Sequence, residues 1–332
     1  MVRLLAAGVV LALGAQPMTA AAAVPPECTD SAPVVCTYDV PPGDYDVKVV
    51  FGREHEPVDV VAEARRLVVS ASSEPVLRFT VNVRDPEGQQ NGFGGPGTPG
   101  LTLRVSGAAP VNVVVTRAPV STRRVFLAGD STVTDQETAP YTGWGQRLPS
   151  RFGQGLSVVN HSGSGESTVS FLAEPAMWAA LRPQLRPRDV VLVQFGHNDK
   201  QTTAEQYRAN LTELVAGIRS AGATPVLVTP IVRRWFTGTK LNSTGLIVNG
   251  LGVDLPAEMR SIAAAEQVGL IDLTARTQAV VEALGPEDAK ALYLTREKRD
   301  DTHTSEYGAT VYAGLVAAEL ARLGLVGDRY WN

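Results

Sequence analysis

Residues 125–131 read Val-Phe-Leu-Ala-Gly-Asp-Ser, an apolar run that ends in one small residue and two polar ones. An apolar run of this length is typical of a buried β-strand, and the polar residues after it then lie at the carboxyl end of the strand. Similar runs follow along the chain at residues 156–160, 190–195, 225–230 and 269–272. The stretch therefore predicts the first strand of a sheet that continues toward the C-terminus.

Segments of helical length separate these strands. They lie at residues 168–181, 204–221, 255–266, 274–284 and 305–323. Apolar strands that alternate with helices indicate a parallel sheet covered on both faces. We therefore expect residues 124–332 to form a doubly wound, three-layer α/β domain, in which ligands bind beyond the carboxyl ends of the strands.

Ahead of this domain the pattern is short and β-like, and no amphipathic run of helical length interrupts it. It predicts a small antiparallel β-sandwich over residues 24–120, joined to the α/β domain by a linker at residues 118–123. The predicted strands, which are apolar or alternate in polarity, lie at residues 45–51, 66–70, 77–83, 101–105 and 111–116.

The first 23 residues have the pattern of a secretion signal. Arg3 precedes an apolar run at residues 4–13, and three alanines at residues 21–23 offer a small-residue cleavage site. A membrane anchor is the alternative, but the run is shorter than the roughly 20 apolar residues that a spanning helix needs. We expect residues 1–23 to be a signal peptide, and the mature protein to be secreted and extracellular without a membrane attachment.

The two cysteines of the chain, Cys28 and Cys36, follow the expected cleavage point. An exported chain meets an oxidising compartment, so we expect a disulfide between them. This bond leaves no thiol for cysteine catalysis or for a zinc site.

The composition narrows the classes of function. Lys and Arg number 30 against 34 Asp and Glu, a net charge of −4, which lacks the basic footprint of a nucleic-acid-binding protein. With 44% hydrophobic and 19% charged residues, the chain has the composition of a globular protein. Fibrous and disordered proteins are therefore excluded.

Four groups of polar residues fall where strands of the α/β domain end or where its last helix begins. Acyl transfer needs a nucleophile, a base, a carboxylate that orients the base, and donors for the oxyanion, and the four groups supply all of these. They are Gly129-Asp130-Ser131, the loop from Asn160 through Gly165, Gly196-His197-Asn198-Asp199, and Asp300-Asp301-Thr302-His303.

Ser131, His303 and Asp300 form the candidate catalytic set. A glycine shortly before Ser131 lets the chain bend sharply in a strand-to-helix turn and leaves the hydroxyl exposed. Asp300 precedes His303 by three residues, a spacing at which both side chains can fold back and hydrogen-bond across a turn. Asp300 would then hold the imidazole tautomer in which Nε2 faces Ser131.

In this order the four groups resemble the sequence blocks of the SGNH (GDS) hydrolase superfamily, whose sheet is flavodoxin-like. The resemblance covers residues 124–325. Within that superfamily the chain is similar to the rhamnogalacturonan acetylesterase group of carbohydrate esterases. The segments that carry this second resemblance are residues 126–133, 143–145, 193–200 and 301–304.

The resemblance implies a role for each residue of the candidate site. Ser131 would be the nucleophile, His303 the base and Asp300 the acid that orients it. The oxyanion would be bound by the backbone N–H groups of Ser131 and Gly165 and by the side-chain amide of Asn198. No metal or nucleotide cofactor is implied.

Three residues near these blocks keep more than one interpretation. His197 either orders the loop of Asn198 or contacts substrate. Trp235, which follows two arginines, either packs locally or stacks on a sugar ring whose carboxylate an arginine could bind. Glu166 stands where the acetylesterase group commonly has an arginine; this reverses a charge near the crevice and leaves a pectin-type substrate open.

We therefore expect a monomeric, secreted serine esterase that removes acetyl groups from a plant cell-wall polysaccharide of the rhamnogalacturonan or pectin type. A lipase or thioesterase of the same superfamily is one alternative, and a carbohydrate-binding protein on an inactive hydrolase scaffold is another. The β-sandwich either binds polysaccharide as a galactose-binding-like module or covers one side of the catalytic domain.

Overall fold

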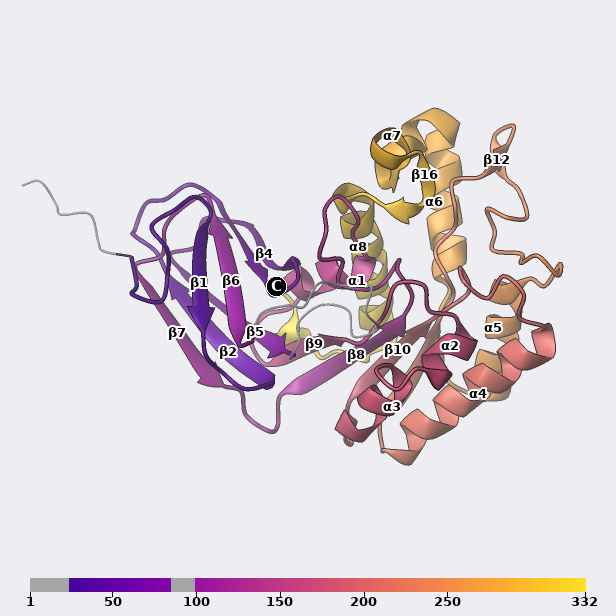
Figure 1. Ribbon diagram of the computed structural model, residues 1–332, viewed down its shortest axis with the longest axis horizontal. Coiled ribbons are helices and arrows are strands. Elements are labelled where there is room, and N and C mark those ends of the chain that lie inside the picture. The colour runs from indigo at the N-terminus through magenta and orange to yellow at the C-terminus, as the bar shows by residue number, and fades with distance from the viewer. Residues whose placement is uncertain (1–23, 85–98) are drawn as a thin grey trace, which may run out of the picture.

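The computed structural model describes residues 24–84 and 99–332, so the predicted signal peptide lies outside the described residues. Antiparallel strands fill the first part of the chain, and a parallel sheet with helices fills the rest (Figure 1). The change takes place between β7, which ends at Arg117, and β8, which begins at Arg123. Among the described residues, no helix has the length and apolar character needed to cross a membrane.

The antiparallel part is a sandwich of two sheets with strand orders β1-β6-β3-β4 and β5-β2-β7. Side chains such as Val47, Phe79 and Leu103 fill the core between the sheets. The strands are β1 (Val34–Tyr38), β2 (Gly43–Val50), β3 (Val58–Ala62), β4 (Arg66–Ser72), β5 (Val76–Val83), β6 (Leu101–Ser106) and β7 (Asn112–Arg117).

Two of these strands, β1 and β3, were not predicted. Each has only five residues, and each pairs with β6, which is distant in sequence. Burial alternates along both strands, and over five residues this leaves only two or three buried positions to indicate a strand.

The parallel sheet has the order β14-β11-β10-β8-β9, and all its neighbouring strands run in the same direction. In chain order this is 2-1-3-4-5, the flavodoxin-like arrangement, which confirms the predicted doubly wound fold. The order reverses between β8 and β10, so ligands are expected at the carboxyl ends of these two strands. The strands are β8 (Arg123–Gly129), β9 (Leu156–Asn160), β10 (Val190–Gln194), β11 (Thr224–Val228) and β14 (Gly269–Ile271).

Helices cover both faces of this sheet. Leu127 and Leu192 point into the layer formed with α1, α6 and α8, whereas their neighbours Phe126 and Val191 point into the layer formed with α2 to α5. The helices are α1 (Trp144–Arg147), α2 (Thr168–Ala173), α3 (Trp178–Leu181), α4 (Ala204–Ser220), α5 (Leu255–Ala265), α6 (Leu273–Asp288), α7 (Thr295–Lys298) and α8 (Glu306–Arg322).

Local sequence explains where these helices begin and end. The long helices α4, α5, α6 and α8 each start after a side-chain cap, at Thr203, Asp254, Asp272 and Ser305. The single helix predicted at residues 168–181 is instead two short helices, α2 and α3. The break falls at Glu174, which precedes a proline and is held in an extended conformation.

The smaller elements complete the C-terminal part. The strand pairs β12–β13 and β15–β16 lie outside the central sheet, and β16 carries two of the predicted site residues. These strands are β12 (Phe236–Thr237), β13 (Lys240–Leu241), β15 (Tyr293–Leu294) and β16 (Asp300–Thr304), and the 3-10 helices are η1 (Leu148–Arg151), η2 (Arg182–Gln184), η3 (Ala289–Leu292) and η4 (Asp328–Tyr330).

The sandwich packs against the edge strand β9 of the parallel sheet. The backbone N–H of Gly155 donates to Thr80 at 2.8 Å, and the hydroxyl of Ser157 donates to the Asp44 carboxylate at 2.7 Å. The two parts of the chain are therefore joined by specific polar contacts as well as by packing.

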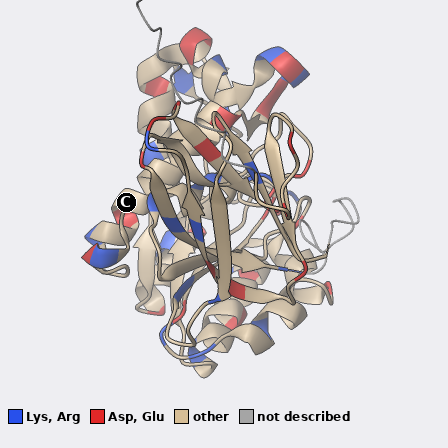
Figure 2. Cartoon of the chain, turned by 90° about the vertical axis from the view of Figure 1, so that its left-hand side faces the viewer, with Lys and Arg blue, Asp and Glu red and all other residues tan. Residues whose placement is uncertain are grey.

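On the side that the sandwich turns outward, charged residues of both signs are interspersed (Figure 2).

Candidate active site

The candidate nucleophile lies in a tight turn directly after β8. The carbonyl of Asp130 accepts from the backbone N–H of Val133 at 3.0 Å, which folds the chain back after Ser131. A Cβ at Gly129 would lie only 2.7 Å from a methyl group of Val133, so the close approach requires glycine. The predicted strand-to-helix turn is wrong in one respect, because α1 begins only at Trp144.

Ser131, His303 and Asp300 form a continuous chain of hydrogen bonds. The distance from Ser131 Oγ to His303 Nε2 is 2.9 Å, and that from His303 Nδ1 to Asp300 Oδ2 is 2.6 Å. Asp300 Oδ1 accepts from the backbone N–H groups of Thr302 and His303 at 2.8 and 2.9 Å. The arrangement can pass a proton from the serine to the histidine while the carboxylate holds the imidazole in place.

The charge on Asp300 fixes which nitrogen of the imidazole carries the proton. Burial alone would raise the pKa of Asp300, but hydrogen bonds from the ring and backbone of His303 and from Thr302 lower it to about 2. The carboxylate is therefore ionised at every pH at which a histidine can act as a base. It accepts a hydrogen bond from His303 Nδ1, which carries the proton. Nε2 is then left to accept from the hydroxyl of Ser131.

The three predicted oxyanion donors come from three different strand ends. Among the described residues, neither the backbone N–H of Ser131 nor that of Gly165 is matched with an acceptor. Gly165 has a φ of 83°, a left-handed conformation that favours glycine. The side-chain amide of Asn198 donates to the carbonyl of Glu166 at 3.1 Å, which uses one of its two N–H bonds and orients the other.

A second buried histidine–carboxylate pair lies beside the catalytic set. His197 Nδ1 is 3.2 Å from Asp130 Oδ2, and both side chains are buried. Burial lowers the pKa of His197, while for Asp130 the raising effect of burial is outweighed by the contacts with His197 and Thr132, which lower its pKa. This pair ties the loop of Asn198 to the nucleophile turn, which agrees with the loop-ordering interpretation of His197.

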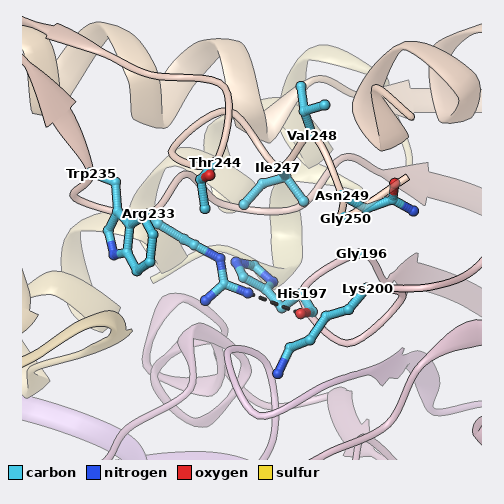
Figure 3. A pocket seen from close by; sticks show the side chains of 10 residues that line it. All are labelled: Gly196, His197, Lys200, Arg233, Trp235, Thr244, Ile247, Val248, Asn249 and Gly250. Atoms are coloured by element: carbon cyan, nitrogen blue, oxygen red, sulfur yellow. Dashed lines mark hydrogen bonds between the residues drawn. The ribbon is translucent and has the colours of Figure 1, made fainter. Parts of the chain in front are cut away.

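A cavity of about 440 Å³ opens next to His197 (Figure 3). Trp235, which is 46% exposed, and the cations Lys200 and Arg233 lie along it. Arg233 donates to Thr302, the neighbour of His303, so the cavity adjoins the catalytic residues. The lining residues are Gly196, His197, Lys200, Arg233, Trp235, Thr244, Ile247, Val248, Asn249 and Gly250.

Two charged residues that the sequence places near the crevice, Glu166 and the second arginine before Trp235, lie outside this cavity. Arg234 forms an ion pair with Asp301 at 2.8 Å, so of the two arginines before Trp235 only Arg233 lines the pocket. Glu166 is 5% exposed and accepts from the hydroxyl of Ser170 at 2.6 Å. The negative charge expected near the crevice therefore lies against the first turn of α2.

Sequence reasoning missed two residues that contact the catalytic set. The side-chain amide of Gln136 donates to the carbonyl of Ser131 at 2.8 Å. The ring of Tyr141 meets the ring of His303 edge to face, with centroids 5.4 Å apart. Both residues lie in the loop after the nucleophile turn, where neither strand nor helix periodicity gives a signal.

The remaining predicted residues lie away from this site. Cys28 and Cys36 form a disulfide in the sandwich, where Cys36 belongs to β1, as the sequence predicts. In residues 24–84 and 99–332, no cluster of three or more His, Cys, Asp or Glu side chains could hold a metal ion.

His161 gives a prediction about stability rather than catalysis. Burial and the nearby positive charge of Arg84 lower its pKa from 6.5 to about 3. As the pH falls below 6.5 the unfolded chain binds a proton that the folded chain does not, so the free energy of unfolding falls. Between pH 7 and pH 4, His161→Gln should lose roughly 3 kcal/mol less than the wild type, as measured by urea unfolding. Equal losses in the two proteins would contradict the assignment.

Comparison with known proteins gives consistent matches. The sequence model of the GDSL-like Lipase/Acylhydrolase family matches residues 127–311. The rhamnogalacturonan acetylesterase RhgT of Bacillus subtilis (strain 168) is 38% identical over 218 residues, which cover 61% of this chain and 91% of the relative. The probable rhamnogalacturonan acetylesterase YesY of the same organism is 33% identical and covers 60% of this chain and 94% of the relative. The crystal structure of YxiM from Bacillus subtilis matches with a TM-score of 0.57 and 25% identity, over 89% of this chain and 81% of that one.

Proposed function

Because the chain belongs to the GDSL-like lipase/acylhydrolase family, we propose that it is a secreted serine esterase that removes acetyl groups from a plant cell-wall polysaccharide of the rhamnogalacturonan type. The observation that carries this proposal is the hydrogen-bonded chain from Ser131 through His303 to Asp300. RhgT is a rhamnogalacturonan acetylesterase and YesY a probable one, which supports acetyl as the acyl group and rhamnogalacturonan as the substrate class.

In the first half of the proposed cycle, Ser131 Oγ attacks the acetyl carbonyl and His303 Nε2 accepts its proton. The carbonyl oxygen becomes an anion, which the backbone N–H groups of Ser131 and Gly165 and the amide of Asn198 stabilise. When the carbon–oxygen bond to the sugar breaks, His303 returns the proton to the sugar oxygen. The acetyl group is then covalently bound to Ser131.

The second half of the cycle repeats these steps with water. His303 accepts a proton from a water molecule, whose oxygen attacks the acetyl carbonyl. The same three donors stabilise the second oxyanion, and the proton returns to Ser131 Oγ as acetate leaves. Asp300 stays ionised throughout and stabilises the imidazolium that forms in each half.

The amide of Asn198 should act mainly in the transition state. Asn198→Ala is expected to lower kcat about 10²- to 10³-fold and to change KM far less, because the oxyanion is absent from the ground state. Steady-state kinetics on a small acetyl ester measure both constants. Asn198→Asp keeps the size but loses the donor, so it should be at least as impaired; a loss confined to KM would argue against the oxyanion role.

The cavity beside the catalytic residues supports a uronate-containing substrate. Lys200 and Arg233 place two cations there, and among the described residues Lys200 has no ion-pair partner. A carboxylate can bind to such cations while the exposed ring of Trp235 stacks on a sugar face. A rhamnogalacturonan chain carries such carboxylates, whereas an unsubstituted xylan chain carries none.

Lys200→Ala is therefore expected to raise KM about tenfold for acetylated rhamnogalacturonan, which corresponds to the loss of one charge-assisted contact. The KM for a small neutral acetyl ester should stay unchanged. Lys240→Ala is the matched control, because Lys240 pairs with Glu282 outside the cavity. An equal rise in KM for both substrates would contradict the uronate assignment.

The proposed function is tested by acetate release from acetylated rhamnogalacturonan, acetylated xylan and a long-chain ester in parallel. Preferred release from the first supports the proposal. Hydrolysis of the long-chain ester alone would keep the serine mechanism and favour a lipase or thioesterase. Binding of polysaccharide without any hydrolysis would favour the carbohydrate-binding protein on an inactive scaffold.

A further inference from the structure

The turn between β3 and β4 of the sandwich reaches into the catalytic domain. Two of its residues, Glu63 and Arg65, have φ values of 53° and 59°, a left-handed conformation that side chains other than glycine rarely adopt. The backbone N–H of Arg65 donates to the carbonyl of Glu63 at 2.8 Å, which closes the turn. This backbone lets the Arg65 side chain leave the sandwich and contact the other domain.

Arg65 joins its own turn to two segments that are distant in the sequence. Its Nη1 donates to the carbonyl of Gln136 at 3.0 Å and to that of Tyr141 at 2.9 Å. Its Nη2 forms an ion pair with Glu306 at 2.6 Å. One guanidinium therefore closes the loop after the nucleophile turn and fixes that loop to the start of α8.

The loop that Arg65 binds contacts the catalytic set directly, and α8 begins close to that set in the sequence. The side chain of Gln136 donates to the carbonyl of Ser131 at 2.8 Å, and the ring of Tyr141 packs edge to face on that of His303. Glu306 is the first residue of α8, three residues after His303. The sandwich is therefore connected to both the nucleophile and the base through Arg65.

Neighbouring contacts hold the same loop from the same turn. Gln146 donates to the carbonyls of Ala64 and Gln136 at 2.6 and 2.8 Å, which bridges the turn and the loop. Arg66 Nε lies 3.1 Å from the Asp135 carboxylate, and both side chains are buried. Removing either buried charge would threaten folding, whereas the side chain of Arg65 is 21% exposed and can be replaced more safely.

We propose that Arg65 is a positioning residue for acyl transfer, through which the β-sandwich completes the active site of the catalytic domain. The inference rests on the proposed esterase function. Arg65 acts through Gln136 on the turn of Ser131 and through Tyr141 on the ring of His303. Without it, the serine and the imidazole remain present but lose the contacts that hold their relative geometry, which acyl transfer requires to within about 1 Å.

The test compares three full-length variants: Arg65→Ala, Arg65→Lys and Arg117→Ala. Arg117 is the matched control, because it is a sandwich arginine that donates to Tyr45 and to the carbonyl of Pro42 within the sandwich itself. Kinetics on p-nitrophenyl acetate give kcat and KM. Titration with a phosphonate that labels the active serine counts the competent sites, so kcat can be stated per site.

For Arg65→Ala we expect kcat per site to fall about 10- to 100-fold with KM within threefold of the wild type. Free guanidinium ion at millimolar concentration should restore part of this loss, and Arg65→Lys, which keeps a cation near Glu306, should be less impaired. Arg117→Ala should keep its kcat per site even where its melting temperature falls. If Arg65→Ala does not fold, the loss of kcat per site is measured on Arg65→Lys instead.

If Arg65→Ala keeps a kcat per site within twofold of the wild type, the positioning role is overturned while the esterase function stands. An equal fall in Arg117→Ala would also overturn it, because the effect would then belong to the sandwich as a whole. If the phosphonate does not label Ser131 in the wild type, the proposed function itself is wrong, and the role of Arg65 with it.

Discussion

Ser131→Ala is expected to lower ester turnover by at least about 10⁴-fold, because it removes the oxygen on which the acyl intermediate would form. Among the residues that the structure describes, the hydroxyl makes one hydrogen bond, to His303, and the Ser131 residue is only 8% exposed. Its removal leaves the turn and the backbone N–H in place. A small residual rate over water should therefore persist from the oxyanion donors.

The measurement is acetate release by the wild type and by the variant, together with thermal unfolding to show that the fold is unchanged. Ser220→Ala is the matched control, because the hydroxyl of Ser220 donates to a helix carbonyl in α4, away from the site. Mass spectrometry of the wild type quenched during turnover should find the acetyl group on Ser131. Turnover above a tenth of the wild-type rate in the Ser131 variant would disprove the nucleophile assignment.

Much of the fold could be predicted because each element of the parallel sheet is coded by its own local pattern. The run that ends at Gly129 is buried on both faces, so its apolar continuity is visible without knowing its partners. Strands β1 and β3 gave no such signal, because their burial alternates along the strand and five residues then leave only two or three buried positions. The break at Glu174 has a local cause in the proline that follows it, because the residue before a proline disfavours the helical conformation.

The candidate site divides in the same way. Ser131, Asn198 and His303 follow strands or precede a helix, and the crevice rule for open α/β sheets brings such positions together. Gln136, Tyr141 and Arg65 cannot be found by that rule. The first two lie in a loop, and Arg65 lies in another domain, 71 residues before the first residue whose carbonyl it binds. Their roles depend on how the domains pack, which no local pattern encodes.

Asp300 carries the second large effect. Its pKa of about 2 lies below the ordinary value of 3.8, so the carboxylate stabilises the folded protein above about pH 4 and loses this contribution as the pH falls toward 2. Over the range in which esterases are assayed it is fully ionised. It therefore serves as a permanent acceptor for His303 Nδ1 and for two backbone N–H groups.

Asp300→Asn should consequently lower kcat about 10³- to 10⁴-fold without a comparable change in KM. An amide cannot match all three donors, and its own N–H favours the imidazole tautomer in which Nε2 carries the proton. That tautomer cannot accept the proton of Ser131, so the nucleophile is present but not activated. Asp301→Asn, the adjacent control whose carboxylate pairs with Arg234, should lose less than tenfold. Equal losses in the two variants would show that Asp300 acts only through the structure of β16, and not through the imidazole.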